Sequence, residues 1–252
     1  IVHHVAEMLY SRVPGGKITK QILDEYIIDE SKAVERQITA SINQFYVSGQ
    51  QDDYTPLRGE ALIQAGVIRH ILTTLFRQEM QFVPFDFVSA EWRRTFQLDV
   101  DGRAVNFTLS IDRIDRVYGR KRIVDYKTGS DITWFRNVDQ LFDNAASIDH
   151  PRGIFQLLMY CCAYAQHEAT DEPLQPYLYS LRTMNVTHLP PVVIGSEKTG
   201  VPLLDYHDVQ EDFWNRFKAM IKEMFDPAVP FVKAKDASAC KYCKFTRLCG
   251  GV

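Results

Sequence analysis

The chain has 252 residues, of which 46% are hydrophobic and 24% charged, a composition that suits a globular protein with a sizeable core. Its apolar runs are too short to span a membrane and its N-terminus lacks the regions of a secretory signal, so we expect a cytoplasmic protein. The net charge of −3 excludes a globally basic surface for nucleic acid, but it leaves room for a local basic groove.

The sequence begins at Ile1 instead of Met, already inside an apolar run that is compatible with a helix. We therefore expect the chain to be a fragment of a longer polypeptide. Helical patterns dominate the first third. The sequence predicts helices from Ile1 to about Arg12, where Pro14-Gly15-Gly16 ends the pattern, from about Ile18 to Tyr46, and from about Leu57 to Met80, with Pro84 closing the region.

Strand-like runs follow near residues 85–90, 92–100, 105–117 and 122–127. Residues 107–112 alternate apolar and polar side chains, which is typical of a strand with one buried face. A tight turn at Tyr118-Gly119 would join this strand to the run from Arg122 to Lys127. The sequence therefore predicts an antiparallel hairpin whose ends carry charges.

The hairpin brings together the residue types of a metal site. Residues two apart on a strand point to the same side, so Asp125 and Lys127 should project together. Asp112 can approach Asp125 across the strand pair, and two converging carboxylates repel each other unless a cation lies between them. Oxygen ligands with open positions suit Mg²⁺ or Mn²⁺.

The hairpin is also rich in basic residues. Each of them alone is most simply a solvated charge that offsets a nearby acid. As a group they would suit a phosphate backbone. The group consists of Arg113, Arg116, Arg120, Lys121 and Arg122.

Downstream of the hairpin, residues 130–152 predict a loop with a short helix, and Ile154 to Gln166 predicts an apolar helix. On that helix Gln156 and Tyr160 share one face, while Cys161 and Cys162 are expected to be buried small hydrophobes. Strands are predicted at 176–183 and 191–195. An amphipathic helix is predicted at 209–225, with a core-facing stripe of Phe213, Trp214, Phe217, Met220 and Met224.

The C-terminus places Cys240, Cys243 and Cys249, three of the five cysteines, in a Cys-x2-Cys-x5-Cys array. Closely spaced thiols in a cytosolic protein favour a metal over a disulfide framework. Three ligands are one short of the usual four of an iron–sulfur cluster or a structural zinc site. The missing ligand is expected upstream of Ile1.

Taken in order, these motifs resemble the PD-(D/E)xK nucleases. The hairpin is similar to their Gly-x-x-Asp and Asp-x-Lys motifs, with Leu109 in place of the glycine, and Gln156 to Tyr160 matches the Gln-x-x-x-Tyr motif of the RecB-like branch, which includes AddB. The resemblance covers almost the whole chain. It implies an α/β fold with a restriction-endonuclease-like core, in which helices flank a central mixed β-sheet. A single nuclease domain would comprise a helical region (1–82), a nuclease core (83–230) and a Cys-rich tail (231–252).

The resemblance also implies roles for individual residues. In the RecB-like branch a histidine on an N-terminal helix binds the metal, and His3 matches it within His3-His4-Val5-Ala6-Glu7, with His4 as the alternative. Glu91 resembles an acid often found ahead of the sheet, although an exposed strand-end glutamate is an equal interpretation. The implied metal ligands are His3, Asp112, Asp125 and the backbone carbonyl of Tyr126, and the implied catalytic residues are Asp112, Asp125, Lys127, Gln156 and Tyr160.

By the same resemblance, Cys240, Cys243 and Cys249 are the last three ligands of an AddB-type four-iron, four-sulfur cluster. The implied function is a Mg²⁺- or Mn²⁺-dependent DNA nuclease, an exonuclease on single-stranded ends, that acts in repair or recombination beside a helicase domain or subunit. Two alternatives remain open. One is a nuclease-fold module that binds DNA ends without cutting them, and the other is a zinc-ribbon protein whose hairpin is only structural.

Overall fold

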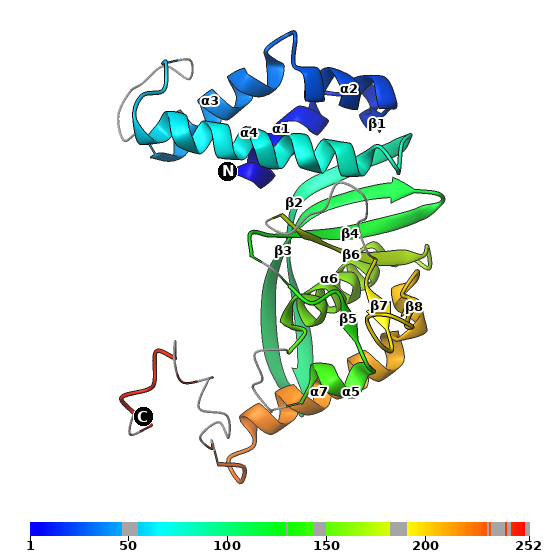
Figure 1. Ribbon diagram of the computed structural model, residues 1–252. Coiled ribbons are helices and arrows are strands. Elements are labelled where there is room, and N and C mark those ends of the chain that lie inside the picture. The colour runs from blue at the N-terminus through cyan, green and yellow to red at the C-terminus, as the bar shows by residue number, and fades with distance from the viewer. Residues whose placement is uncertain are drawn as a thin grey trace. The chain divides into compact units, whose positions relative to one another are not determined.

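The computed structural model describes residues 1–46, 55–129, 131–143, 150–181, 191–230, 232, 240 and 243–249 (Figure 1). The chain divides into two compact units. Unit 1 consists of Ile1–Trp92, Ser110–Ser130 and Tyr179–Pro190, and unit 2 of Arg93–Leu109, Asp131–Leu178 and Pro191–Val252. Within the described residues, no helix is both long enough and apolar enough to cross a membrane. The predicted boundaries at residues 82 and 230 stay predictions.

A five-stranded sheet has the strand order β1-β2-β3-β4-β6. Its strands are β1 (Lys17–Ile18), β2 (Phe85–Val100), β3 (Arg103–Val117), β4 (Arg120–Lys127) and β6 (Leu174–Ser180). The two runs predicted at 85–90 and 92–100 form the single strand β2, which continues through Glu91 even though that residue has a left-handed backbone, with φ 46°. The mixed α/β architecture, with helices flanking a central sheet, confirms the predicted fold class.

The predicted hairpin of β3 and β4 is confirmed. The strands pair antiparallel from Arg113 opposite Val124 to Val117 opposite Arg120. Tyr118 and Gly119 form the turn with φ of 49° and 77°. Positive φ at both central residues is the geometry whose twist matches that of the two strands. Continued by one residue, this register places Asp112 opposite Asp125.

Four helices belong to unit 1: α1 (Val2–Ser11), α2 (Lys20–Ile28), α3 (Ala33–Tyr46) and α4 (Glu60–Glu79), with a 3-10 turn at Pro14–Gly16. The prediction of one helix from Ile18 to Tyr46 is wrong, because Asp29 adopts a left-handed conformation with φ 57° and ends α2. The Asp29 carboxylate then accepts hydrogen bonds from the backbone N–H groups of Val34 (2.9 Å) and Glu35 (3.0 Å). This carboxylate caps the first turn of α3.

The core of unit 1 lies where the helices pack on one another and on the hairpin. α4 packs against α2 and α3, and α1 packs against α3 and α4 (Figure 1). Their buried side chains include Val5, Leu9, Tyr10, Leu72 and Phe76. The hairpin adds the buried residues Ile111, Ile114, Ile123 and Val124. Because consecutive positions on both strands are buried, the part of the hairpin in unit 1 is enclosed on both faces.

Unit 2 contains the helices α5 (Val138–Leu141), α6 (Arg152–Glu168) and α7 (Gln210–Phe225), and a 3-10 turn at Tyr206–Asp208. A small sheet has the order β5-β7-β8, formed by Trp134–Phe135, Val193–Ile194 and Val201–Pro202. The short helix predicted within 130–152 is therefore confirmed as α5, while residues 144–149 lie outside the described residues. Residues 182 and 183 of the strand predicted at 176–183 also lie outside them.

Aromatic side chains build the core of unit 2. Phe213 and Phe217 of α7 are buried, and the ring of Phe213 lies 5.7 Å from that of Phe155 on α6. Cys161 and Cys162 are buried, as predicted. The prediction that the whole α7 stripe is core is wrong for Met224, whose side chain is 53% exposed. It lies in the last turn of α7, beyond the helix's buried residues, which end at Ile221.

Candidate metal centre

His3, Glu91 and Asp112 converge in unit 1. They come from α1, β2 and β3, and one potential ligand atom from each lies within 4.8 Å of the others. His3 Nδ1 is 3.6 Å from Asp112 Oδ2. An imidazole beside two carboxylates is a donor set for a divalent cation.

Local backbone structure fixes the two acids. The backbone N–H of Tyr126 donates a hydrogen bond of 2.7 Å to Asp112 Oδ2, and the hydroxyl of Ser110 donates one of 3.2 Å to Glu91 Oε2. The left-handed backbone of Glu91 interrupts the regular alternation of side chains along β2. The structure thus brings Glu91, whose role the sequence left open, beside His3 and Asp112.

Asp125 and Lys127 of β4 project together, as two residues on the same strand face should. Lys127 Nζ lies 2.8 Å from Asp125 Oδ2. The Asp125 side chain is 4% exposed and that of Lys127 26%, so the carboxylate is deep in the protein while the ammonium reaches solvent. A carboxylate and an ammonium group beside His3, Glu91 and Asp112 are a combination that suits metal-assisted hydrolysis.

Burial shifts the ionisation of the site residues. It raises the pKa of Asp112 to about 6, although the hydrogen bond from Tyr126 acts in the opposite direction, and Glu91 raises it further. It also raises the pKa of Asp125, against the hydrogen bond from Lys127. Burial lowers the pKa of His3, which favours the neutral imidazole that binds metals.

The residues of this centre fit a divalent metal ion. His3 Nε2 is buried and has no hydrogen-bond partner among the described residues. A buried polar atom without a partner is costly, and a metal ion would satisfy it. The same positive charge would favour the ionised forms of Asp112 and Asp125, whose pKa values are raised without it. Within the described part of the chain, Cys240, Cys243 and Cys249 form no such group.

The structure distinguishes the two neighbouring histidines. His4 lies 3.5 Å from Glu7 on its own helix, and its ring meets the ring of Phe45 edge-on at 5.3 Å. It lines a groove between α1 and α3. The geometry therefore brings His3, and not the alternative His4, to Asp112.

The prediction that the hairpin arginines contact phosphate is wrong for Arg113 and Arg122. Their side chains are only 2% and 1% exposed, and both pair with Asp115, which is fully buried. An arginine held in the core by a carboxylate cannot reach a DNA backbone. Arg116, Arg120 and Lys121 are at least partly accessible to solvent. The available signal for this pairing was that Arg113 and Asp115 lie two apart on β3, with Arg122 of β4 directly opposite Asp115.

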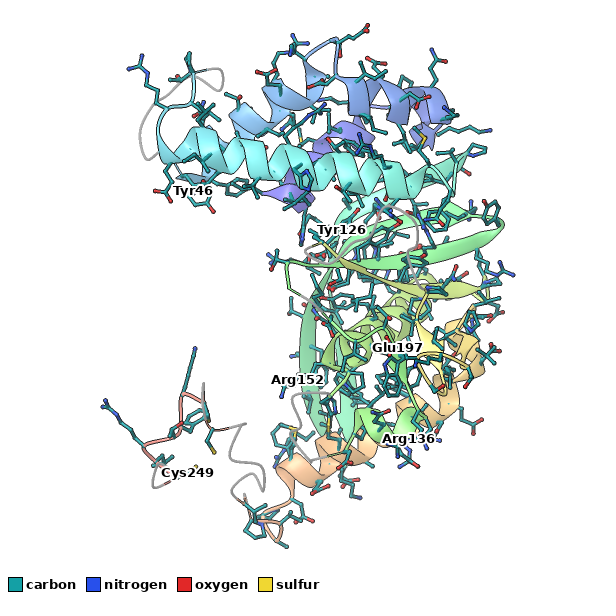
Figure 2. The ribbon with its side chains drawn as sticks, in the orientation of Figure 1. Tyr46, Tyr126, Arg136, Arg152, Glu197 and Cys249 are labelled. Atoms are coloured by element: carbon teal, nitrogen blue, oxygen red, sulfur yellow. The ribbon has the colours of Figure 1, made fainter. Side chains whose placement is uncertain are left out.

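The other predicted site residues belong to unit 2. Gln156 Nε2 donates a short hydrogen bond to the Tyr160 hydroxyl along α6, so these two side chains lie together as predicted. Of the three tail cysteines, Cys240 is partly exposed, while Cys243 and Cys249 are exposed, and all are free thiols. Cys249 is labelled in Figure 2. No association with metal follows from the described residues of the tail.

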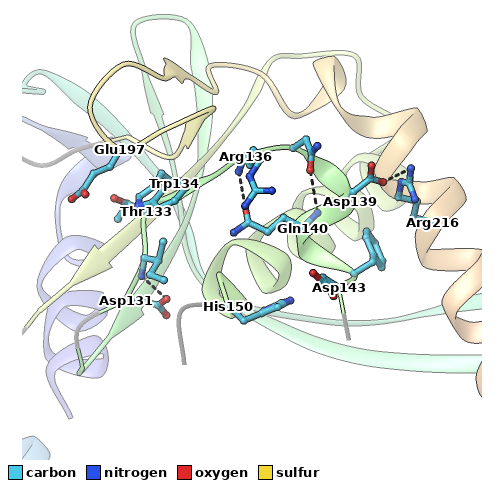
Figure 3. A pocket seen from close by; sticks show the side chains of 13 residues that line it. Asp131, Thr133, Trp134, Arg136, Asp139, Gln140, Asp143, His150, Glu197 and Arg216 are labelled. Carbon is cyan, nitrogen blue, oxygen red and sulfur yellow. Dashed lines mark hydrogen bonds and ion pairs between the residues drawn. The ribbon is translucent and has the colours of Figure 1, made fainter. Parts of the chain in front are cut away.

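Unit 2 also has a polar pocket of about 1150 Å³ (Figure 3). Acidic and basic side chains line it together, among them Asp131, Arg136, Asp139 and Arg216. Arg216 forms an ion pair with Asp139. The pocket contains none of the sequence-predicted site residues among the described residues that line it. Its mixed charges give no indication of a second metal centre.

A family model for the PD-(D/E)XK nuclease superfamily matches residues 1–250. The chain belongs to the PD-(D/E)XK nuclease superfamily. Members of this superfamily are generally nucleases that hydrolyse phosphodiester bonds. The crystal structure of SSO0001 is similar over 98% of this chain and 85% of its own, with 13% sequence identity and a TM-score of 0.29. No curated protein matches the chain.

Proposed function

We propose that this PD-(D/E)XK protein is a Mg²⁺- or Mn²⁺-dependent deoxyribonuclease of the RecB-like branch, which degrades single-stranded DNA from its ends during repair or recombination. The observation that carries the proposal is the convergence of His3, Glu91 and Asp112, with His3 Nε2 buried and without a partner in the described structure. The preference for single-stranded ends rests on the RecB-like motifs alone.

In this proposal His3, Asp112 and Asp125 hold the divalent ion together with the backbone carbonyl of Tyr126, and Glu91 completes the acidic side of the site. Three features support these roles: the 3.6 Å approach of His3 to Asp112, the burial of Asp125, and the register that places the two aspartates opposite each other. A bound ion would activate water and offset the charge that develops on the phosphate.

Lys127 is the proposed catalytic residue. Its ammonium group is anchored 2.8 Å from Asp125 and still reaches solvent, so it can donate to a phosphate oxygen or hold the attacking water. The proposed role of Gln156 and Tyr160 is to orient the scissile strand. Their mutual hydrogen bond supports a joint role, because it fixes the two polar groups relative to each other.

We also propose that Cys240, Cys243 and Cys249 are cluster ligands in a longer polypeptide that contains a fourth cysteine and a helicase-like region. Their spacing supports this, and so does the hydrogen bond of 3.4 Å from the backbone N–H of Phe245 to Cys243 Sγ, since such bonds tune iron–sulfur clusters. Iron and sulfide analysis of the longer protein tests it. Four iron atoms per chain are expected, and zinc without sulfide would contradict it.

A cleavage assay tests the proposed activity. End-labelled single-stranded and duplex DNA are incubated with the protein in Mg²⁺, Mn²⁺ or EDTA. We expect degradation that requires the metal and is faster on single strands. Asp125→Ala and Lys127→Ala should each reduce the rate at least about 100-fold without unfolding the protein. The matched controls are Asp24→Ala and Lys20→Ala, which make the same changes at an exposed ion pair on α2.

The outcomes separate the alternatives. Full activity in Asp125→Ala or Lys127→Ala would refute the assigned site. DNA binding without cleavage by the wild type, in a protein shown to bind Mn²⁺, would favour the non-cutting DNA-binding module. Loss of activity in Asp24→Ala or Lys20→Ala as well would mean that the assay reports general instability rather than the site.

A further inference from the structure

A network of buried charges lies beneath the metal centre in unit 1. Arg113 Nη2 is 2.5 Å from Glu79 Oε1 and 2.9 Å from Asp115 Oδ2. Arg122 binds Asp115 through two hydrogen bonds of 2.7 and 2.8 Å. All four side chains are at most 2% exposed. With two acids and two bases the network is neutral, which avoids the cost of an unpaired charge in the protein interior.

Tyr126 connects this network to the metal centre. Arg113 Nη1 donates a hydrogen bond of 2.5 Å to the Tyr126 hydroxyl (Tyr126 is labelled in Figure 2). The ring centroid of Tyr126 lies 5.0 Å from that of His3, and the backbone N–H of Tyr126 binds Asp112. The same residue therefore touches two of the three converging ligands and, at its other end, a buried guanidinium.

We infer that Tyr126, anchored by Arg113, is a positioning residue that holds His3 and Asp112 in the geometry that binds the divalent ion. This inference rests on the proposed metal site. It assigns a role to the side chain of Tyr126, distinct from that of its carbonyl, and to the two arginines that cannot reach DNA.

The charge network fixes the orientation of the Tyr126 side chain. A buried ion network is weak support for stability, because desolvation offsets most of its attraction, but it defines a single arrangement of the groups it contains. Arg113 is confined by Glu79 and Asp115, so the hydrogen bond it donates to Tyr126 fixes the direction of the phenol. That direction sets the ring surface against His3. Residues that orient metal ligands without contacting the metal themselves typically contribute 10- to 100-fold to metal affinity.

Tyr179 provides a matched control. Its hydroxyl accepts a hydrogen bond of 3.3 Å from Arg122 Nη1, and its side chain is fully buried. Its ring lies 5.4 Å from that of Tyr126. Tyr126→Phe and Tyr179→Phe thus each remove one hydroxyl that accepts a hydrogen bond from an arginine of the same network. Of the two rings, that of Tyr126 is the one that lies against His3.

The experiment measures the dissociation constant of Mn²⁺ by electron paramagnetic resonance for the wild type and both variants, with no DNA present. We expect Tyr126→Phe to weaken Mn²⁺ binding roughly tenfold and Tyr179→Phe to change it less than about twofold. Thermal denaturation in EDTA should show similar losses of stability for both. In NMR spectra of the metal-free protein, the ring signals of His3 should shift more in Tyr126→Phe than in Tyr179→Phe.

The outcomes separate this inference from the proposed function. Failure of the wild type to bind Mn²⁺ would overturn the metal site itself. A wild type that binds Mn²⁺, with equal affinity in both variants, would overturn the positioning role alone. If Tyr126→Phe is partly unfolded, the NMR signals of His3 in its folded fraction decide, and unshifted signals there would contradict the inference.

Discussion

Asp112→Asn should stabilise the metal-free protein at pH 8 while it abolishes metal binding. The side chain of Asp112 is mostly buried, and burial raises its pKa to about 6 from the ordinary 3.8. Asparagine has nearly the same shape, carries no charge, and keeps an oxygen that can accept the hydrogen bond from the Tyr126 N–H. The substitution therefore removes an unfavourable buried charge.

The magnitude follows from linkage. A carboxyl group whose folded pKa lies above its unfolded pKa contributes most stability at low pH and loses it as the pH rises through the folded value. The rise in the pKa of Asp112 from 3.8 to about 6 corresponds to roughly 3 kcal/mol in the free energy of unfolding. We expect the free energy of unfolding of Asp112→Asn to exceed that of the wild type by up to ~3 kcal/mol at pH 8. This difference should vanish toward pH 4.

Urea denaturation in EDTA at several pH values measures this difference. Asp24→Asn is the control, because it removes a carboxylate from an exposed ion pair with Lys20 and should show no comparable gain. Saturating Mn²⁺ should stabilise the wild type, by ~2.7 kcal/mol at one hundred times the dissociation constant, and leave Asp112→Asn unchanged. If Asp112→Asn is less stable than the wild type at pH 8 in EDTA, or if the difference does not depend on pH, the buried Asp112 carboxylate does not destabilise the metal-free protein.

Three further predictions address the charge network, the pH response and the second core. Asp115→Asn should lower the free energy of unfolding by ~3–5 kcal/mol in urea denaturation, because it leaves Arg122 buried without its carboxylate and removes one of the two carboxylates that pair with Arg113. A loss as small as that of Asp24→Asn would contradict the assigned pairing. Mn²⁺ affinity, measured by calorimetry, should fall as the pH drops below about 6, since protons then compete for Asp112, and an affinity independent of pH between 5 and 8 would argue against Asp112 as a ligand. Phe213→Ala should lower the free energy of unfolding by ~3–5 kcal/mol, because Phe213 is buried in the aromatic core of unit 2. Met224→Ala should have little effect, because that side chain is 53% exposed, and thermal denaturation of both variants measures the difference.

The hairpin could be predicted from sequence because its signals are local. Alternation along β3 and a turn at Tyr118-Gly119 fix the pairing, and the pairing in turn places Asp112 opposite Asp125 and Lys127 beside it. These three residues needed no long-range information. Their order in the chain, together with Gln156 and Tyr160, was sufficient to suggest the nuclease superfamily.

Other features depend on contacts between distant parts of the chain. The apolar periodicity runs through residues 18–46, and only the left-handed turn at Asp29 and its capping bonds divide the helix. The burial of Arg113 requires Glu79, a residue of α4 with no sequence signal of its own. Glu91 enters the metal centre through a backbone conformation that strand propensity does not predict.

The proposed activity depends on a divalent ion that binds to His3, Asp112 and Asp125, with Glu91 on the acidic side of the site. Diffraction from crystals soaked in Mn²⁺, recorded at a wavelength where manganese scatters anomalously, tests it most directly. We predict one strong anomalous peak within bonding distance of a ring nitrogen of His3 and the carboxylates, and its loss in Asp112→Asn. A peak elsewhere in the protein with none at this centre, or no peak at all in a protein that cleaves DNA with Mn²⁺, would contradict the proposed metal site.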